Sequence, residues 1–199
     1  MTERTPALAP AGSTGAGPAT AAPPDFAGAL SAYAAGVTLV TIADGRDDIG
    51  TTVSAFCPVS VEPPLVLVSL LAASYPAELL GTSPGDGAGP ADGGGQGGAA
   101  AGRFAVCLLA ADQRMLAGRF AAAGRPNARR MLAEVPHRRG AVSGALIPDG
   151  GLAALECEVS QRIAAGDHLV LIARVLAVPY QAPSGDPLIR FRGRYPALG

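Results

Sequence analysis

The amino-acid sequence predicts a mainly β protein, a small antiparallel barrel of six or seven strands with two or three flanking helices. One observation is that short runs of β-branched and aliphatic residues recur along the chain, separated by turn residues. A second is that most of these runs are joined by hairpin-like turns, such as AAGD at 164–167. Strands joined by hairpins with few helices are typical of antiparallel barrels.

The first third of the chain should contain one helix and three strands. Asp25 is a good N-cap for a helix over 26–34, which Gly36 would end. Its apolar residues fall on one face: Phe26, Ala29, Leu30 and Tyr33. Strands are expected over 37–43, 50–56 and 65–70. The last, LVLVSL, contains Ser69 as its single polar residue and should be buried on both faces.

The remaining helices and strands are predicted from the same kinds of local sequence pattern. A short helix should begin near Ser74, with Pro76 in its first turn. A strand over 104–109 precedes a helix capped by Asp112, and residues 124–150 should be mostly irregular. Further strands are expected over 151–164, 168–178 and 188–193.

Composition divides the chain into a tail, one domain and an insertion. Residues 1–24 are rich in Pro, Ala and Gly and should form a disordered tail, because they cannot bury enough apolar surface to become ordered. Residues 25–199 have the length of a single domain. Within it, the glycine-rich stretch 81–102 should be a flexible surface insertion.

The charge balance excludes several functions. The net charge is −1 and the positive charges are all arginine, so we expect neither nucleic acid nor a membrane as a partner.

With two histidines in the chain, no histidine-based metal site is expected. Cys57, Cys107 and Cys157 form no C-x-x-C pair and should be buried fillers. No secretory h-region is present, so a cytoplasmic location is expected.

One motif match does not indicate a catalytic site. Residues 81–85 match G-x-S-x-G, but a nucleophile elbow needs a strand before the serine and a helix after it. Here Pro84 and a glycine run follow, so we assign the match to chance.

Four segments in a fixed order carry the functional signal. They are GTTVSAFCPVSVEPPLVLVSL at 50–70, ASYP at 73–76, AAGDHLVLIARV at 164–175 and PLIRFRGRY at 187–195. Together they resemble the short-chain flavin reductases, whose fold is the FMN-binding split barrel. The likeness is greatest to the flavin:NADH oxidoreductase components of actinobacterial aromatic polyketide monooxygenases. It covers residues 26–199 outside the glycine-rich insertion.

The resemblance implies a flavin site and a nicotinamide site. Against the flavin ring it implies Thr52, Val53, Ser54 and Ala55, with Thr51, Ser69 and Leu70 close by and Ser74 at the phosphate. Near the nicotinamide it implies His168, with Tyr195 helping to cover that site. Short hydroxyls and backbone groups suit the polar edge of a flavin. An ordinary half-buried strand and a turn histidine would give the same residues, and this alternative stays open.

The implied activity is an NAD(P)H:flavin oxidoreductase, with FMN or alternatively FAD as the flavin and NADH or NADPH as the donor. Because the cofactors carry the hydride chemistry, no acid–base pair is required. A homodimer is implied, with reduced flavin passing to a separate monooxygenase component. Two alternatives remain: a flavin-binding split-barrel protein without reductase activity, and a related flavin-dependent oxidase of a small molecule.

Besides the glycine-rich insertion at 81–102, which falls close to the expected phosphate-binding side, the chain departs from the family pattern at two places. Relatives often carry Arg or Lys between the core strand and the serine turn, where residues 71–74 here are LAAS. A typical asparagine is Cys107 in this chain. The missing positive charge could come from Arg119, Arg129 or Arg130, and the sequence does not choose among them.

Overall fold

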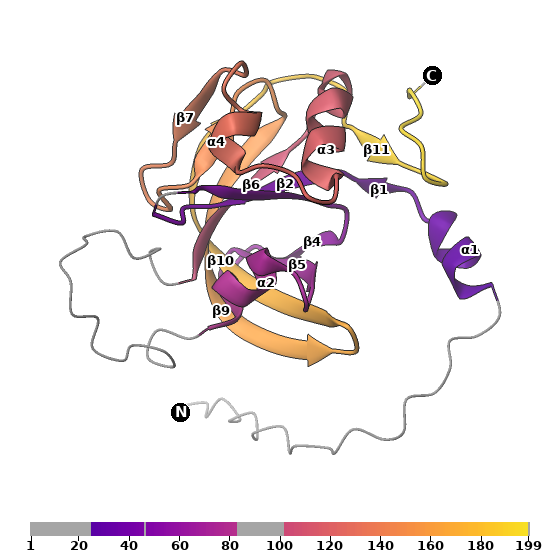
Figure 1. The fold of residues 1–199 in the computed structure, drawn as a ribbon, viewed down its shortest axis with the longest axis horizontal. Helices are drawn as coiled ribbons and strands as arrows, with labels where there is room; N and C mark the ends of the chain where they lie inside the picture. The colour runs from indigo at the N-terminus through magenta and orange to yellow at the C-terminus, as the bar shows by residue number, and fades with distance from the viewer. Residues whose placement is uncertain (1–24, 46, 83–101, 199) are drawn as a thin grey trace, which may run out of the picture.

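The computed structural model describes residues 25–45, 47–82 and 102–198, so the expected tail and all but the ends of the expected insertion lie outside the described residues. A seven-stranded antiparallel sheet dominates the structure (Figure 1). Its strands, in spatial order, are β3 (Ile49–Val53), β2 (Thr38–Ile42), β6 (Arg103–Leu108), β9 (Ala153–Ala165), β10 (His168–Gln181), β5 (Leu65–Leu71) and β4 (Phe56–Ser60). The mainly β fold class is therefore confirmed.

The two edge strands of this sheet, β3 and β4, are consecutive in the chain. Only Ser54 and Ala55 separate them, so the sheet has to curl until its edges meet. The Ser69 N–H donates to the Ala55 carbonyl at 3.0 Å, which continues the β4–β5 pairing into this junction. The prediction of a single strand over 50–56 was wrong, because the residues before Ser54 pair with β2 and the residues after Ala55 pair with β5. We call Ser54–Ala55 the seam.

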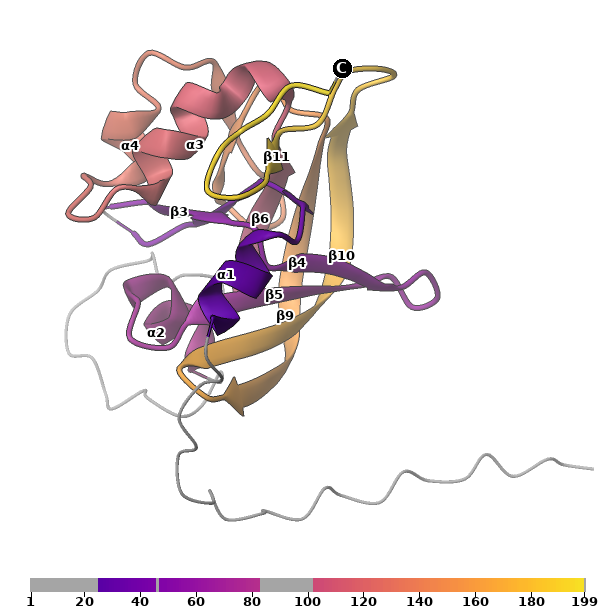
Figure 2. The same cartoon turned by 90° about the vertical axis from the view of Figure 1, so that its right-hand side faces the viewer.

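The long hairpin of β9 and β10 joins the two halves of the sheet, with β6 on one side and β5 on the other. It runs much of the length of the molecule (Figure 2). Gly166 makes its turn at φ 62°, a left-handed conformation that favours glycine. Register shifts within the pair, such as that between Ile172 and Ala173, let the two strands bend around the core.

The core has two parts. The first lies within the curled sheet and contains Val40, Val53, Val68, Phe104 and Leu171. The second lies on the other side of β2 and β6, beneath α3 (Arg114–Ala121), α4 (Ala128–Met131), β7 (His137–Arg139) and β8 (Leu146–Pro148).

Strand β5 corrects one prediction about burial. Val66, Val68 and Leu70 are buried, whereas Leu65, Leu67 and Ser69 are half-buried. Successive strand residues point to opposite faces, so one face of β5 enters the core and the other keeps contact with solvent. The expectation of burial on both faces was wrong.

The first helix, α1 (Phe26–Ser31), is shorter than expected and makes no side-chain cap with Asp25. Gly36 does not end it, because Ala35–Gly36 forms β1 and pairs with β11 (Ile189–Arg190). That pairing leaves β11 as two residues of the strand expected over 188–193. The helix contains no buried residue.

The other helices follow the sequence more closely. The helix α2 (Tyr75–Gly81) has Ser74 as its N-cap and Pro76 in its first turn, as predicted. By contrast, α3 begins at Arg114 after a 3-10 turn at Ala111–Gln113, so Asp112 is not its cap. Residues 124–150 are not mostly irregular, since α4, β7 and β8 lie there.

The three cysteines are free and differ in environment. Cys107 and Cys157 are buried as predicted, and burial raises the pKa of each to about 12. Cys57 is exposed on β4, so its expected role as a buried filler was wrong. Within the described ranges, no helix is both long and apolar enough to span a bilayer.

Candidate functional site

Two clefts lie at opposite ends of β3. One has a volume of about 560 Å³ and lies between α1, the seam and the loop after β11; we call it the α1 cleft. The other has a volume of about 570 Å³ and lies between the start of α2 and the loop Gly124–Asn127; we call it the α2 cleft. Gly50 lines the α2 cleft and Ser54 lines the α1 cleft, about 13 Å apart along the strand at about 3.3 Å per residue.

The α1 cleft brings together three of the expected site residues. Ser54 and Ala55 come from the seam, and His168 comes from the start of β10. His168 lies opposite Leu71 in the β5 pairing, which fixes it beside the same strand that the seam contacts. Segments more than 100 residues apart in the chain thus form one cleft.

His168 is held in place by its neighbour. Its Nδ1 atom lies 2.7 Å from Asp167 Oδ1, and the imidazole side chain is 44% exposed. This hydrogen bond lowers the pKa of the Asp167 carboxyl. The backbone carbonyl of Asp167 accepts from the N–H of Ala72 at 2.9 Å, so the turn is tied to the end of β5. The ring is therefore oriented and still open to a ligand.

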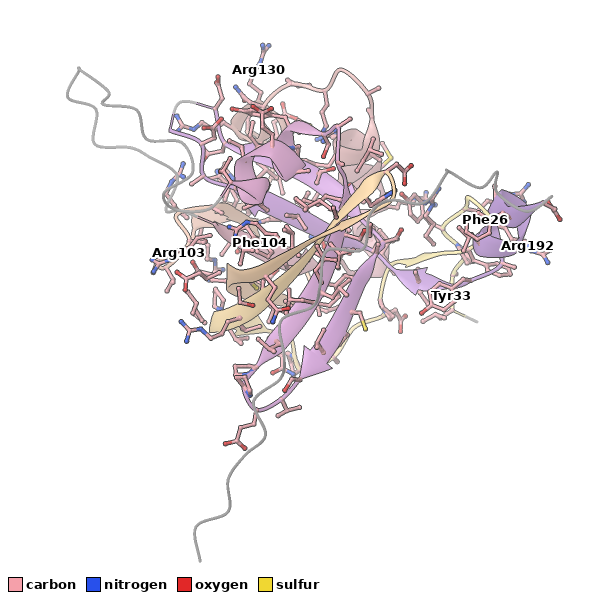
Figure 3. All side chains as sticks on the ribbon, turned by 90° about the horizontal axis from the view of Figure 1, so that it is seen from below. Phe26, Tyr33, Arg103, Phe104, Arg130 and Arg192 are labelled. Atoms are coloured by element: carbon pink, nitrogen blue, oxygen red, sulfur yellow. The ribbon has the colours of Figure 1, made fainter. Side chains whose placement is uncertain are left out.

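The outer wall of the α1 cleft consists of residues that the sequence did not single out as site residues. Tyr33 and Arg192 line the cleft, and Phe26 lies near them on α1, at the end of the molecule away from Arg103 (Figure 3). The N–H of Arg192 donates to the Ser31 carbonyl at 2.8 Å, which ties α1 to the loop after β11. Further lining residues are Leu30, Arg190 and Gly193.

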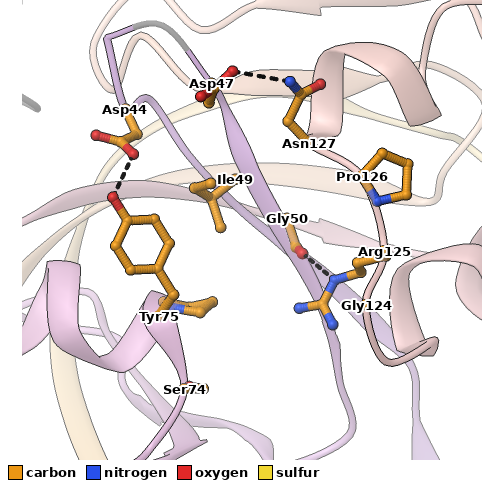
Figure 4. Close-up of a pocket in the computed structure, with 11 residues that line it drawn as sticks. Asp44, Asp47, Ile49, Gly50, Ser74, Tyr75, Gly124, Arg125, Pro126 and Asn127 are labelled. Atoms are coloured by element: carbon orange, nitrogen blue, oxygen red, sulfur yellow. Dashed lines mark hydrogen bonds between the residues drawn. The ribbon is translucent and has the colours of Figure 1, made fainter.

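The α2 cleft contains Ser74 and several polar side chains (Figure 4). On one wall the Tyr75 hydroxyl donates to Asp44 Oδ2 at 2.7 Å, which raises the pKa of Tyr75. On the other wall Asn127 Nδ2 donates to Asp47 Oδ1 at 3.0 Å. Ser74 Oγ accepts from the Ala77 N–H at 3.4 Å as the helix cap. The cleft thus combines hydrogen-bonding groups with one aromatic ring.

Among the described residues that line the α2 cleft, Arg125 is the cationic one, and the sequence did not single it out. Its Nε donates to the Gly50 carbonyl at 2.9 Å and its Nη1 to the Ala122 carbonyl at 3.2 Å. Burial lowers the pKa of its guanidinium. The sequence did hold a signal that Arg125 has a fixed position. Arg125 directly precedes Pro126 and the N-cap residue Asn127, and these two residues restrict the local backbone.

The three arginines named from the sequence lie elsewhere. Arg129 pairs with Asp48, and Arg119 and Arg130 line a separate depression of about 500 Å³ on the far side of Arg125. None of the three lines the α2 cleft that contains Ser74.

Asp48 anchors the loop that bears Arg125. Its side chain is 1% exposed and accepts hydrogen bonds from Arg129 and Arg139. Burial alone would raise the pKa of Asp48, but the hydrogen bonds from Arg139 and Arg129 outweigh burial and hold the pKa below its usual value. The Asp48 carbonyl also accepts from the Ala128 N–H at 2.6 Å. The start of α4 is therefore fixed against the turn before β3.

The remaining expected residues are less available to a ligand. Val53 and Leu70 are buried in the core, so they could offer only backbone groups. The hydroxyl of Thr52 donates to the Ala117 carbonyl at 2.8 Å and so contacts α3. Tyr195 packs against the second core beneath α3 and lines neither cleft. Thr51 and Ser69 are half-buried and line neither cleft.

Comparison with known proteins gives a consistent result. Residues 30–199 match the family described as the flavin reductase like domain. An NADH-dependent FMN reductase of Streptomyces nodosus subsp. asukaensis is 31% identical over 178 residues, covering 87% of this chain and 84% of that protein. The reductase component of a Thermus thermophilus 4-hydroxyphenylacetate 3-monooxygenase is 34% identical over 173 residues, covering 87% of this chain and 95% of that protein.

The fold also matches solved structures. An NADH:FAD oxidoreductase of Streptomyces globisporus, in complex with NAD and FAD fragments, superposes with a TM-score of 0.72 at 25% identity. The match covers 91% of this chain and 98% of that one. The family, the split-barrel fold and the class of activity expected from the sequence are thus confirmed. This chain belongs to the flavin reductase like domain family.

Proposed function

We propose that this protein is an NADH-dependent flavin reductase that reduces FMN and releases the product to a separate monooxygenase. The single observation that carries the proposal is the α1 cleft, in which the seam residues Ser54 and Ala55 meet His168 within a chain of this family. The relatives support NADH as the hydride donor and a monooxygenase as the recipient of reduced flavin. One relative is an NADH-dependent FMN reductase and another is the reductase component of a monooxygenase.

The flavin would lie along β3, with its ring at the seam and its phosphate in the α2 cleft. Ser54 and the backbone of the seam offer hydrogen-bonding groups to the polar edge of the ring without bulky side chains. Arg125 and Ser74 would hold the phosphate, and Arg125 supplies the positive charge that residues 71–74 lack. The distance of about 13 Å from Gly50 to Ser54 would be spanned by the ribityl chain together with part of the ring.

His168 would orient the nicotinamide against the ring. A bound flavin supplies the hydride acceptor, and the protein has to hold donor and acceptor within about 3–3.5 Å. His168 lies in the same cleft as the seam, and Asp167 fixes its ring through a 2.7 Å contact. An imidazole in this position can hydrogen-bond the nicotinamide carboxamide and limit its rotation.

We also propose a cytoplasmic homodimer. Phe26, Leu30 and Tyr33 expose 49%, 57% and 75% of their surface around a helix that buries nothing. Exposed apolar residues that gather in one place mark an association surface. A second copy packed on α1 would close the outer wall of the α1 cleft. The cytoplasm fits because all three cysteines are free thiols.

The test is NADH oxidation by the purified protein in air, followed by absorbance, with and without added FMN. We expect rapid oxidation only when FMN is added, which would identify flavin as a diffusing substrate. Flavin binding without oxidation of NADH or NADPH would overturn the proposal and favour a flavin-binding protein without reductase activity. Tightly bound flavin that turns over a small molecule without NADH would favour the oxidase alternative.

A further inference from the structure

We propose that the depression lined by Arg119, Arg125 and Arg130 docks an acidic surface of the protein that receives reduced flavin, and that Arg125 couples this docking to flavin release. We call it the arginine depression. The inference rests on the proposed function, because it takes the flavin phosphate to lie beside Arg125 in the α2 cleft. Two observations carry it: the charge gathered around α3 and α4, and the position of Arg125 between the depression and the α2 cleft.

Positive charge is concentrated in the segment that forms the arginine depression. Residues 111–140, all of which the structure describes, contain seven of the chain's 15 basic residues and two acidic ones. Three of these arginines are paired with Asp48 or Asp149. Among the described residues, however, no carboxylate forms an ion pair with Arg119 or Arg130. These two guanidinium groups are therefore placed to bind carboxylates that another molecule supplies.

The surroundings of the depression have the composition of a protein interface. The helices α3 and α4 lie side by side (Figure 1, Figure 2), and the depression between them has a volume of about 500 Å³. Arg130 extends outward from the molecule (Figure 3), and Met115 on α3 is 68% exposed. Arginine and methionine are enriched in protein interfaces. The small side chains of Ala122 and Ala133 line the same depression, so a partner's backbone can approach closely.

The distribution of charge favours an acidic protein over a nucleic acid. Glu134 lines the depression together with the three arginines, and a phosphate backbone laid across it would be repelled by this carboxylate. Outside residues 111–140 the chain is net acidic, so a long polyanion would meet repulsion beyond the depression. A folded protein can present a few carboxylates to the arginines and a cation or neutral group to Glu134.

Arg125 connects the depression to the α2 cleft, because it lines both. Its Nε donates to the carbonyl of Gly50, which lines the α2 cleft, and its Nη1 donates to the carbonyl of Ala122, which lines the depression. A guanidinium has five N–H donors, so donors remain for an anion on either side. A flavin phosphate in the cleft and a carboxylate in the depression would approach the same cation and repel each other.

This geometry implies negative coupling between docking and flavin binding. A partner whose carboxylates occupy the arginine depression should weaken the binding of FMN, and bound FMN should weaken docking by the same factor. Reduced flavin would then be released where its recipient is already docked.

The experiment uses a fluorescently labelled oligoglutamate peptide, titrated into the full-length protein and followed by anisotropy. We expect binding that weakens as salt is added. The double variant Arg119→Gln/Arg130→Gln should bind the peptide about tenfold more weakly, because charge-assisted contacts are lost. The matched control is Arg103→Gln/Arg174→Gln, which changes the net charge equally at two residues that pair with Glu158 and lie outside the depression. The control should bind as the wild type does.

The coupling is measured on flavin. A saturating concentration of the peptide should raise the dissociation constant for FMN about fivefold and leave that for riboflavin, which has no phosphate, unchanged. In Arg125→Gln this dependence on the peptide should disappear. Without the peptide, Arg119→Gln/Arg130→Gln should oxidise NADH at the wild-type rate with FMN, because neither residue lines the α1 cleft or the α2 cleft.

Three results would overturn the inference. They are equal peptide affinities in the two double variants, an FMN affinity that is independent of the peptide, and tighter binding of a duplex DNA oligonucleotide than of oligoglutamate at the same ionic strength. None of them bears on the reductase proposal, which fails if no flavin stimulates NADH oxidation.

Discussion

The N–H of Ser69 donates to the carbonyl oxygen of Ala55 at 3.0 Å. This contact joins the two segments that the sequence assigns to the flavin, although 14 positions separate them. It extends the β4–β5 pairing by one residue, so the backbone of the seam that would face the ring is fixed to β5. A preorganised wall of this kind lowers the cost of ordering a ligand.

The first prediction concerns His168. In His168→Ala, kcat/KM for NADH should fall about ten- to a hundredfold, because a misplaced nicotinamide loses its alignment with the flavin. The dissociation constant of the flavin should stay unchanged. The matched control is His137→Ala, since His137 is exposed on β7 and lines neither cleft. Equal losses in both variants would contradict the role of His168.

The second prediction separates two neighbouring hydroxyls. Thr52→Val should lower the free energy of unfolding by about 1 kcal/mol, because the bond to the Ala117 carbonyl is lost. It should leave flavin affinity unchanged. Ser54→Val should instead weaken flavin binding several-fold with little effect on stability, since Ser54 lines the α1 cleft. Chemical denaturation and flavin titration of both variants check this, and the reverse pattern would contradict it.

The third prediction concerns Arg125. In Arg125→Gln, the KM for FMN should rise about tenfold or more, because a charge-assisted hydrogen bond to phosphate contributes about 1.5–3 kcal/mol. The KM for riboflavin, which has no phosphate, should not change. Arg130→Gln is the control, since Arg130 is exposed and lies outside the α2 cleft. A loss with riboflavin as large as that with FMN would indicate a structural role only.

The fourth prediction concerns Asp48 and pH. Its pKa is lowered in the folded protein, so its contribution to stability is present above the ordinary value of 3.8 and is lost as the pH falls through the folded value. Asp48→Asn should cost about 3 kcal/mol at neutral pH, at the low end for buried pairs because Arg129 and Arg139 are half-exposed.

The pH dependence provides the check on Asp48. The difference in unfolding free energy between wild type and Asp48→Asn should shrink as the pH falls below about 4, because the Asp48 carboxyl of the unfolded chain then takes up a proton while that of the folded protein, with its lowered pKa, stays ionised to lower pH. Denaturant titrations at neutral and acidic pH measure it. A difference that stays constant between these two conditions would show that packing, rather than the carboxylate charge, accounts for the loss.

Much of the fold could be predicted because local patterns decide it. The β9–β10 hairpin followed from two apolar runs around Gly166, and α2 followed from Ser74 and Pro76. The break at Ser54 could not be predicted, because nothing in TTVSAF shows that its two halves pair with different strands. Likewise, the pattern of α1 predicted an apolar face but not that the face would be exposed.

The candidate site was predictable only where a motif marked it. Ser54, Ala55 and His168 came from the family resemblance, and the structure brings them into one cleft. Arg125 was not singled out as a site residue, because its position depends on how the loop before α4 packs against the turn before β3. Tyr75 was not singled out either, because its contact with Asp44 joins positions 31 residues apart in the chain. The packing of the loop relies on Asp48, whose two arginine partners are 81 and 91 positions away in the chain.

The strand order has a consequence for synthesis of the protein. The seam and β5 lie before residue 72 in the chain. The strands β6, β9 and β10, which occupy the middle of the sheet, come later and end at Gln181. During synthesis the edge strands β3 and β4 would therefore leave the ribosome before these middle strands. The wall that we propose faces the flavin can therefore acquire its final shape only after nearly the whole chain has emerged, so newly made protein should gain the capacity to hold flavin late.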